Sequence, residues 1–516
     1  MPQLHQPRQL LWSCISAISE MVIAQTLSCP EPIQNVSTRK LLLKYVPPLL
    51  LQDILNCVMR MIAIHHAPRA SAKVVTCLLE ILIHPRLLEL RLSDLSYVGS
   101  VELEALDMVE NTLIKLLPSL SHLTHLNLST NRNKITFPSC STEILQVVGC
   151  SCPNLQLLDL NHNNRVTGEG LLYLYPSDTR DGCAKLEKLF IQDCSIEPED
   201  VAMLIHFFPN LQIVGYKELG TSLQMLKSQP RKFSWKRRRY QYCLKLTHVD
   251  NSLSRVQRCD GDVVDFVCES CPDLENLKVR VCDEDVGGMG RLEKLKHLEL
   301  RFYTGVHHPI SLSTLSYLMD HGHRLASLAI FCNRLHARHI QTIAESCINL
   351  KKLFLHANAA VMDTLLQSNE NAMSKLEVLS LRLGHDELIM SPGACDIACF
   401  LIQPAKALQE LYLLVRSHGI NHAFIVRLLE INPLSKLKIL IADAPRRTLA
   451  APMLELTFDT AYLIINNCPS IQLLGNLICW SVTSAQVAEL RAVIRMCNYN
   501  LTIIHTQSNK LNNKHF

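Results

Sequence analysis

Aromatic residues and enzyme motifs are both scarce in this chain of 516 residues. Only 5% of the residues are aromatic, whereas leucine is abundant. The sequence contains no Gly-rich phosphate-binding loop, no His-Glu-x-x-His zinc motif and no Gly-x-Ser-x-Gly nucleophile turn. These absences argue against nucleotide-dependent enzymes, zinc proteases and α/β hydrolases. We therefore expect a protein that has no catalytic residues and needs no cofactor.

Long apolar runs are also missing. No run reaches the roughly 18 apolar residues that a membrane-spanning helix needs, and Glu20 interrupts the first apolar stretch. No basic region or small-residue cleavage site frames that stretch, so we read no signal peptide there. The 21 cysteines are scattered rather than paired in spacing, which suits reduced thiols. We expect a protein without membrane contact that is located in the cytoplasm, the nucleus or both.

Strong charge bias is absent as well, because the net charge is +4 and the pI is near 8.2. One local exception is the run Arg231–Arg239, which is interleaved with Phe233 and Trp235. Such runs occur in nuclear-import signals, nucleic-acid patches and substrate-binding arms, and more often in solvated loops. Nothing else in the chain indicates nucleic acid, so we interpret this run as an exposed loop.

Metal ligands with suitable spacing are lacking too. Cys259, Cys268, Cys271 and Cys282 include one Cys-x-x-Cys pair, but a structural zinc site usually has two such pairs. We therefore expect no metal site.

What the sequence does contain is the recurring phrase Leu-x-x-Leu-x-Leu, as in Leu123-Thr-His-Leu-Asn-Leu128. Regular copies start at Leu87, Leu123, Leu155, Leu186, Leu274, Leu295, Leu325, Leu350, Leu376, Leu408 and Leu437, and degraded copies at Leu211, Leu244, Ile471 and Leu501. The copies are about 30 residues apart, which leaves room for a strand and a helix in each unit. This pattern predicts an α/β leucine-rich-repeat solenoid, a horseshoe of about fifteen repeats with one continuous core.

A second phrase precedes several copies, as in Ser151-Cys-Pro-Asn-Leu155 and Ser270-Cys-Pro-Asp-Leu274. Here the small Cys fits against a neighbouring helix, and Pro ends the helix before the next strand. The phrase resembles the cysteine-containing class of leucine-rich repeats, which is familiar from F-box and related ubiquitin-ligase receptors.

Three segments fall outside the repeat pattern. Residues 1–80 carry no repeat phrase, and we expect helices there, joined by a polar link near Cys29–Thr38. Within the solenoid at 81–505, residues 217–242 are expected to form an inserted loop. Residues 506–516 are polar, and we expect a disordered tail.

The N-terminal segment carries the most specific motif. Leu10, Cys14 and Ile18 recur every four residues, so on a helix they share one face. The pattern resembles the elongin-binding box, Ser/Thr/Pro-Leu-x3-Cys-x3-aliphatic, and departs from it at Gln9. Val46 and Pro47, followed by apolar Leu50 and Ile54, resemble the cullin box that follows an elongin box. Together with the repeats, the two boxes are similar to substrate receptors of elongin–cullin ligases, including the Zyg-eleven family. The resemblance implies elongin B/C and a cullin as partners of these seven residues.

Two alternatives remain open for the same segment. Val46–Ile54 also resembles the opening of an F-box, which would imply the Skp adaptor instead, although Leu49 replaces the acidic residue and no closing phrase follows. The segment also suits a plain helical cap over the first repeat, because terminal repeats need caps. In that case the chain would be a non-ligase protein-interaction scaffold.

The concave face of the solenoid is the expected target-binding surface. Strand residues alternate between the two faces of a sheet, so positions three, five and seven of each phrase point away from the core. In the middle repeats they are Lys188, Phe190, Lys278, Arg280, His297, Glu299, Arg301, Phe331, Lys352, Phe354, His356, Arg382, Glu410 and Tyr412. Cations outnumber anions in this set, and exposed charge also serves solubility. Basic groups interleaved with aromatics suit an acidic, partly apolar peptide. Combined with the resemblance of the N-terminal boxes to those of elongin–cullin receptors, this surface leads us to expect a substrate-recognition subunit of a cullin-RING ubiquitin ligase.

Overall fold

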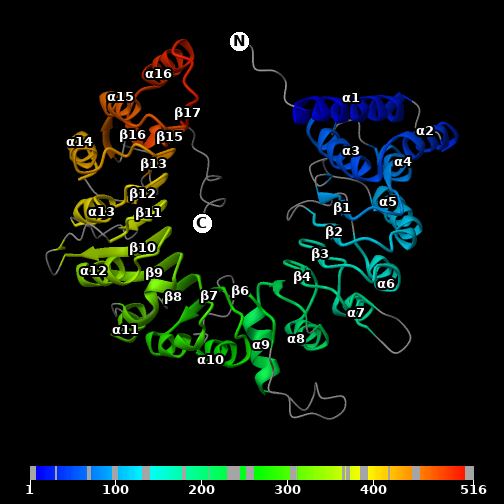
Figure 1. The fold of residues 1–516 in the computed structure, drawn as a ribbon, viewed down its shortest axis with the longest axis horizontal. Coiled ribbons are helices and arrows are strands. Elements are labelled where there is room, and N and C mark those ends of the chain that lie inside the picture. The colour runs from blue at the N-terminus through cyan, green and yellow to red at the C-terminus, as the bar shows by residue number, and fades with distance from the viewer. Residues whose placement is uncertain are drawn as a thin grey trace. The chain divides into compact units, whose positions relative to one another are not determined.

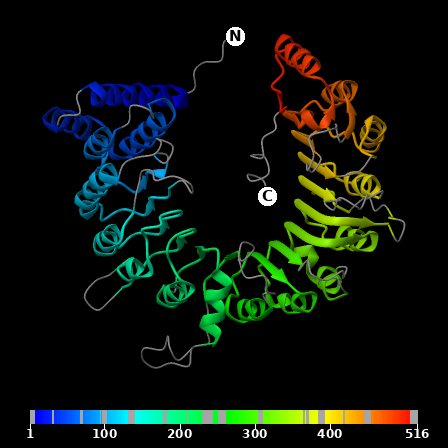
Figure 2. The same ribbon diagram turned by 180° about the vertical axis from the view of Figure 1, so that it is seen from behind.

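The computed structural model describes residues 7–28, 32–66, 71–93, 95, 103–130, 140–176, 182–208, 210–228, 244–250, 261–302, 310, 312–362, 366–367, 372–383, 393–415, 419–443 and 454–505. The chain divides into two compact units, unit 1 (Met1–Arg255) and unit 2 (Val256–Phe516). In each unit, parallel strands follow one another in chain order and helices cover one face of the sheet (Figures 1 and 2).

Unit 1 begins with a helical module. Its elements are α1 (Pro7–Ser28), α2 (Pro32–Tyr45), α3 (Pro48–Met61), a π-helical turn η1 (Ile62–His66) and α4 (Ala72–Leu82). Helix α1 packs on α3 and α4, and α2 packs on α4. Arg39 of α2 donates to the carbonyl oxygens of Glu80 (2.6 Å) and Ile83 (3.2 Å). This guanidinium satisfies acceptors that the C-terminal end of α4 would otherwise leave exposed, and so fixes α2 in place.

The repeats of unit 1 follow this module. The strands are β1 (Glu89–Arg91), β2 (His125–Asn127), β3 (Leu157–Asp159), β4 (Lys188–Phe190), β5 (Ile213–Gly215) and β6 (His248–Asp250). The helices are α5 (Leu103–Leu116), η4 (Leu117–Ser119), α6 (Thr142–Ser151), α7 (Gly168–Leu172), α8 (Pro198–Phe207) and α9 (Leu219–Ser228). Equivalent leucines pair across neighbouring strands, as in Leu90 with Leu126 and Leu126 with Leu158.

Unit 2 continues the same pattern, and its strands between residues 276 and 443 are longer than those of unit 1. They are β7 (Asn276–Val281), β8 (His297–Phe302), β9 (Ser327–His336), β10 (Lys352–Val361), β11 (Val378–Leu383), β12 (Glu410–Val415), β13 (Ile439–Asp443), β15 (Leu473–Gly475) and β17 (Thr502–Ile503). A small second sheet pairs β14 (Leu454–Thr457) with β16 (Trp480–Ser481). The helices are α10 (Gly261–Ser270), η5 (Asp283–Arg291), α11 (Leu312–His321), η6 (Gly322–Arg324), α12 (Ala337–Ser346), α13 (Ala394–Ile402), α14 (His422–Ile431), α15 (Phe458–Asn467), η7 (Leu477–Cys479) and α16 (Ser484–Met496).

Every copy of the leucine phrase, regular or degraded, coincides with one strand of the main sheets among the described residues. The leucines at its first, fourth and sixth positions face the helices and are almost fully buried, as in Leu155, Leu158 and Leu160. Burying one such side chain contributes about 1.5–3 kcal/mol. Since each repeat adds several, the periodic leucines form the core, and the predicted leucine-rich-repeat fold is confirmed.

The cysteine phrase closes helices as expected. Cys152, Cys347 and Cys468 each follow the last residue of a helix and are completely buried. The carbonyl oxygen of Cys152 accepts a bond from the amide of Leu155 (3.2 Å), and the other two make the same contact with the first residue of the next phrase. Burial raises the pKa of Cys152 and Cys347 to about 12 and that of Cys468 to about 11. These thiols therefore act as small apolar groups.

Two expected loops are helical. Residues 219–228 of the expected loop 217–242 form α9, which packs on α8 and buries Leu219, Leu223 and Leu226. The polar link expected near Cys29–Thr38 lies mostly within α2, because Arg39 and the buried Leu42 anchor this helix on α4. The basic run Arg231–Arg239 and the tail 506–516 lie outside the described residues.

The expectation about apolar runs is wrong for α1. Leu10–Ser28 is long and apolar enough to cross a membrane by length and composition, with 28% of its most apolar window buried. Glu20 is the one charged residue within Leu10–Ser28, and it and the serines there lower the mean hydropathy of this stretch too little to exclude it.

Three of the four candidate zinc cysteines lie in the part of the chain that the structure describes. Cys268 and Cys271 are buried at the end of α10, Cys282 is disulfide-bonded, and Cys259 lies outside the described residues. Across the part of the chain that the structure describes, no group of three or more potential ligand side chains comes together.

Candidate protein-binding surface

A shallow groove lies on the helix-free face of unit 2, which is the sheet face opposite the helices. It has a volume of about 250 Å³ and crosses strands β7 to β10. Its walls are Asn276, Lys278, His297, Leu298, Glu299, Ser327, Ala329, Phe331, Lys352 and Phe354. Five of the residues predicted for target binding line this groove, namely Lys278, His297, Phe331, Lys352 and Phe354. The strand register places them there, because equivalent positions of successive repeats lie side by side.

Beside the groove, position-seven residues form a row across five strands. Arg280, Arg301, Phe331, His356 and Arg382 are paired in register from β7 to β11. Arg301 lies over the ring of Phe331, with 4.2 Å between its guanidinium carbon and the ring centroid, and the imidazole of His356 lies 5.3 Å from the same centroid. Such a cation–π contact holds a guanidinium in a fixed orientation. The structure therefore brings together all of the predicted cations of unit 2.

The charges of this surface are unequal in sign. Glu299 is the one carboxylate among the strand positions that face the groove, and its Oε1 accepts a bond from Arg301 Nε at 2.6 Å. Partial burial, followed by the charge of Lys352, lowers the pKa of His297. Burial also lowers the pKa of Arg382. Both shifts arise because burial disfavours the charged form, and a nearby carboxylate would favour that form again.

The helix-free face changes character beyond β10. Val378, Tyr412 and Ile441 form a buried apolar cluster, against which Phe354, Ile439, Leu473 and Ile504 pack. Except for Ile504, which follows β17, these side chains occupy positions three and five of the repeats from β10 to β15. The aliphatic residues at these positions are visible in the sequence, but the predicted contact residues were only the charged and aromatic ones, so the cluster was not predicted.

Tyr412 was predicted as an exposed contact residue, and the structure corrects this. Its side chain is 4% exposed, and its hydroxyl donates to Glu410 Oε2 at 2.8 Å. Because the apolar side chains of neighbouring strands cover the ring, Tyr412 supports the cluster rather than offering a free ring.

The other two predicted contact residues, Lys188 and Phe190, lie on β4 of unit 1. A side chain at Gly215, on the neighbouring strand β5, would collide with the Phe190 ring, since an added Cβ would lie 2.5 Å from ring atom Cδ1. The absence of a side chain at Gly215 therefore leaves room for this ring beside β5.

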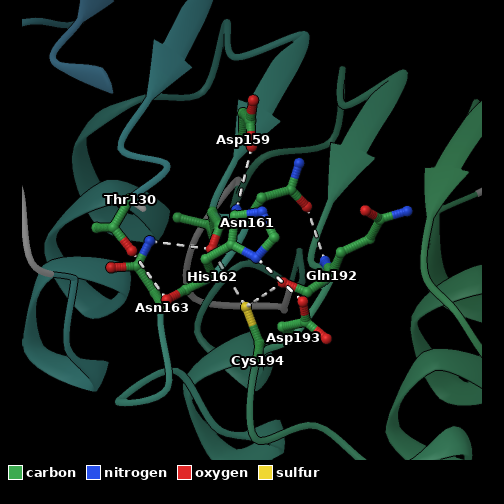
Figure 3. Close-up of polar contacts among 9 residues, drawn as sticks. Thr130, Asp159, Asn161, His162, Asn163, Gln192, Asp193 and Cys194 are labelled. Carbon is green, nitrogen blue, oxygen red and sulfur yellow. Dashed lines mark hydrogen bonds and ion pairs between the residues drawn. The ribbon is translucent and has the colours of Figure 1, made fainter. Parts of the chain in front are cut away.

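The turns after β3 and β4 carry a polar network that could be mistaken for an active site (Figure 3). His162 Nδ1 lies 3.1 Å from Asp193 Oδ2, and Asn161 Oδ1 accepts a bond from the amide of Gln192 at 2.7 Å. The nearby thiol of Cys194 donates to the carbonyl of Leu160 at 3.2 Å. Burial raises the pKa of this thiol to about 12, so it is a poor nucleophile.

The members of this network are equivalent positions of two successive repeats, 31 residues apart. Asn163 occupies the same turn position as Cys194, and its side chain is almost fully buried. The network therefore holds one repeat on the next, and we assign it a structural role.

The elongin-box residues lie on the exposed side of α1. Leu10 is 65% exposed, Cys14 is exposed and Ile18 is half-buried. Ile15, Ser19, Val22, Ile23 and Thr26 form the opposite, buried side of the helix. The structure thus leaves the predicted face of α1 accessible.

The cullin-box residues are less accessible. Pro47 is exposed, while Val46 and Leu50 are half-buried. Ile54 is 1% exposed, in contrast to its predicted role in partner binding. It lies on the side of α3 that is covered within the helical module, so it contributes to the core.

No protein-family model matches the sequence, and no curated protein sequence matches it. Among solved structures, the yeast Rad7 and Elc1 complex aligns with 88% of this chain and 98% of its own, at 14% identity and a TM-score of 0.39. A Listeria monocytogenes internalin aligns over 76% of this chain and 83% of its own, at 13% identity and a TM-score of 0.33. A leucine-rich-repeat protein of Leptospira interrogans aligns over 81% of this chain and 96% of its own, at 15% identity and a TM-score of 0.26. The fold assignment follows from the strands and helices themselves: the chain is an α/β leucine-rich-repeat protein.

Proposed function

We propose that this chain is a substrate-recognition subunit of a cullin-RING ubiquitin ligase. In this proposal, α1 binds an elongin adaptor, the turn before α3 contacts a cullin, and the helix-free face of unit 2 holds the target protein. The chain itself performs no bond chemistry, and ubiquitination is accelerated because the target is held at a high effective concentration near the conjugating enzyme.

The observation that carries the proposal is the exposed apolar face of α1. Leu10, Cys14 and Met21 lie on the side of the helix opposite its buried side, and Leu10 and Met21 are among the most exposed large apolar residues described. Water-exposed apolar side chains that cluster on one helix face commonly mark an interaction site. A protruding leucine beside a small cysteine suits a partner pocket with room for only one large side chain.

A non-ligase interaction scaffold is the second candidate, and the burial of Ile54 favours it. If α3 serves only to cap the first repeat, its apolar side should be covered, as Leu51, Ile54 and Leu55 are. Both candidates use the groove of unit 2, and they differ in whether the α1 face has an adaptor.

Co-purification distinguishes the candidates. The full chain would be co-expressed with elongin B/C and, separately, with the Skp adaptor. The test variant is Leu10→Ser/Cys14→Glu. The matched control is Leu312→Ser/Cys497→Glu, which changes an exposed leucine and an exposed cysteine in unit 2 in the same way.

We expect the wild type and the control variant to recover elongin, and the test variant to lose at least nine tenths of it. Equal recovery by the test variant, or no recovery by the wild type, contradicts the proposal. Recovery of the Skp adaptor alone would indicate an F-box-type receptor, and recovery of neither would indicate a scaffold.

A further inference from the structure

The basic groove and the apolar cluster of unit 2 share one residue, Phe354. It is a wall of the groove over β7 to β10 and also packs against the cluster that continues to β17. We propose that they form one bipartite site for an extended segment of a partner protein, acidic at one end and aliphatic or aromatic at the other. This deepens the proposed function, because it defines the chemistry of the target segment.

Charge complementarity defines the acidic end. Positions five and seven of β7 to β11 present Lys278, Arg280, Arg301 and Arg382, and position three adds Lys352. Glu299 is the one carboxylate among these positions, and its bond with Arg301 already compensates it in part. An acidic segment would gain from several cations at once, whereas a basic segment would be repelled.

The apolar end is defined by the later strands. The repeat of β13 carries Ile439 and Ile441 at positions three and five of its phrase, and the repeat of β15 carries Leu473 at position three. Ile504 follows β17. Ile439, Leu473 and Ile504 are each half-buried and leave apolar surface facing solvent. The carboxylates nearby are already engaged, Glu410 by the hydroxyl of Tyr412 and Asp443 by the thiol of Cys479. Each of these carboxylates thus keeps a donor from within the chain, which lowers the cost of burying apolar partner groups beside it.

The geometry of the sheet sets the length and direction of the segment. The part of the site from Lys278 on β7 to Leu473 on β15 spans seven strand-to-strand steps of about 4.8 Å, which is roughly 34 Å. An extended chain advances about 3.3–3.6 Å per residue. The segment therefore has about ten residues and runs across the strands, with its acidic half over the groove.

Selection from a random decapeptide display library on the purified full chain tests this inference. We expect the enriched peptides to combine an acidic half with an apolar half. Binding of the best peptide, measured by fluorescence anisotropy, should weaken at least tenfold in Lys278→Glu/Lys352→Glu. It should weaken comparably in Ile439→Ser/Leu473→Ser. The control Lys294→Glu/Lys375→Glu makes the same charge change at two exposed lysines outside the face and should retain affinity.

Three results would overturn the inference: no enrichment over the bare support, enrichment of peptides that lack an acidic half, or equal affinity for all three variants. Circular dichroism melts identify any variant that fails to fold, and the remaining variant then decides. The Leu10→Ser/Cys14→Glu chain should bind the peptide like the wild type. A failure of peptide binding is thereby distinguished from a failure of the adaptor proposal.

Discussion

Replacing Asn163 by alanine should destabilise unit 1 far more than replacing an asparagine whose hydrogen bonds are exposed. The Asn163 side chain is 4% exposed. Its Nδ2 donates to the carbonyl oxygens of Leu128 (2.8 Å) and Leu160 (2.9 Å), and its Oδ1 accepts a bond from the amide of Cys140 (3.1 Å). The bonds to Leu128 and Cys140 connect the turn after β3 with the preceding repeat, and the bond to Leu160 lies within the turn itself.

The size of the effect follows from what alanine would leave behind. The carbonyl of Leu160 keeps its bond from the Asn163 main-chain amide. Among the described residues, the carbonyl of Leu128 and the amide of Cys140 would lose the partner that the side chain supplies. A buried polar group left without a partner costs about 1–3 kcal/mol, so the expected loss for these two groups is about 2–6 kcal/mol.

Asn154→Ala is the matched control. This side chain also bridges two repeats, donating to the carbonyl of Ser121 (2.9 Å) and accepting from Lys185 (2.7 Å), but its bonds are exposed. Water can replace them, so the loss should stay below about 0.5–1 kcal/mol. Urea unfolding followed by circular dichroism gives both values, and hydrogen exchange at the Cys140 amide localises the effect. Equal losses in the two variants would refute the argument from burial.

Three further results follow from burial and capping. Ile54→Ala should lower the free energy of unfolding by about 2–5 kcal/mol, and Leu10→Ala by less than about 0.5 kcal/mol. Denaturant titration measures both losses, and equal losses would show that Ile54 has no core role. Burial raises the pKa of Cys347 to about 12, so little of its thiol is ionised at pH 8 and the ionised fraction increases as the pH rises toward 12. At pH 8, iodoacetamide should therefore modify the exposed Cys497 before Cys347, and mass spectrometry measures the order. Arg39→Met should cost about 1–3 kcal/mol and increase hydrogen exchange in the last turn of α4, and unchanged exchange there would argue against a capping role.

The strands could be predicted from the sequence because their signal is local and periodic. Each copy of the Leu-x-x-Leu-x-Leu phrase predicted a strand. The degraded copies at Leu211 and Ile471 also form strands, because one or two buried aliphatic residues suffice where the neighbouring strands set the register. Helix α9 was not predicted, although Leu219, Leu223 and Leu226 have helical spacing, because the basic run Arg231–Arg239 in the same stretch favoured a loop.

The candidate sites were predictable only in part, because side-chain accessibility depends on what packs from elsewhere. The helical spacing of Leu10, Cys14 and Ile18 predicted a shared face, but the sequence could not show that α3 covers the other side of α1. The same packing buries Ile54, which looked equally suitable for a partner.

The residues of both candidate surfaces contribute less to the fold than the core leucines do, and this difference makes the binding proposals testable by mutation. The leucines that form the core point toward the helices, while positions three, five and seven point the other way. A substitution at exposed Lys352 therefore leaves the leucine core untouched, and the same holds for Leu10 on the exposed side of α1. Because a repeat protein gains most of its stability from the core between neighbouring repeats, both surfaces can change in sequence without loss of the fold. Loss of binding in these variants then reports on recognition rather than on unfolding.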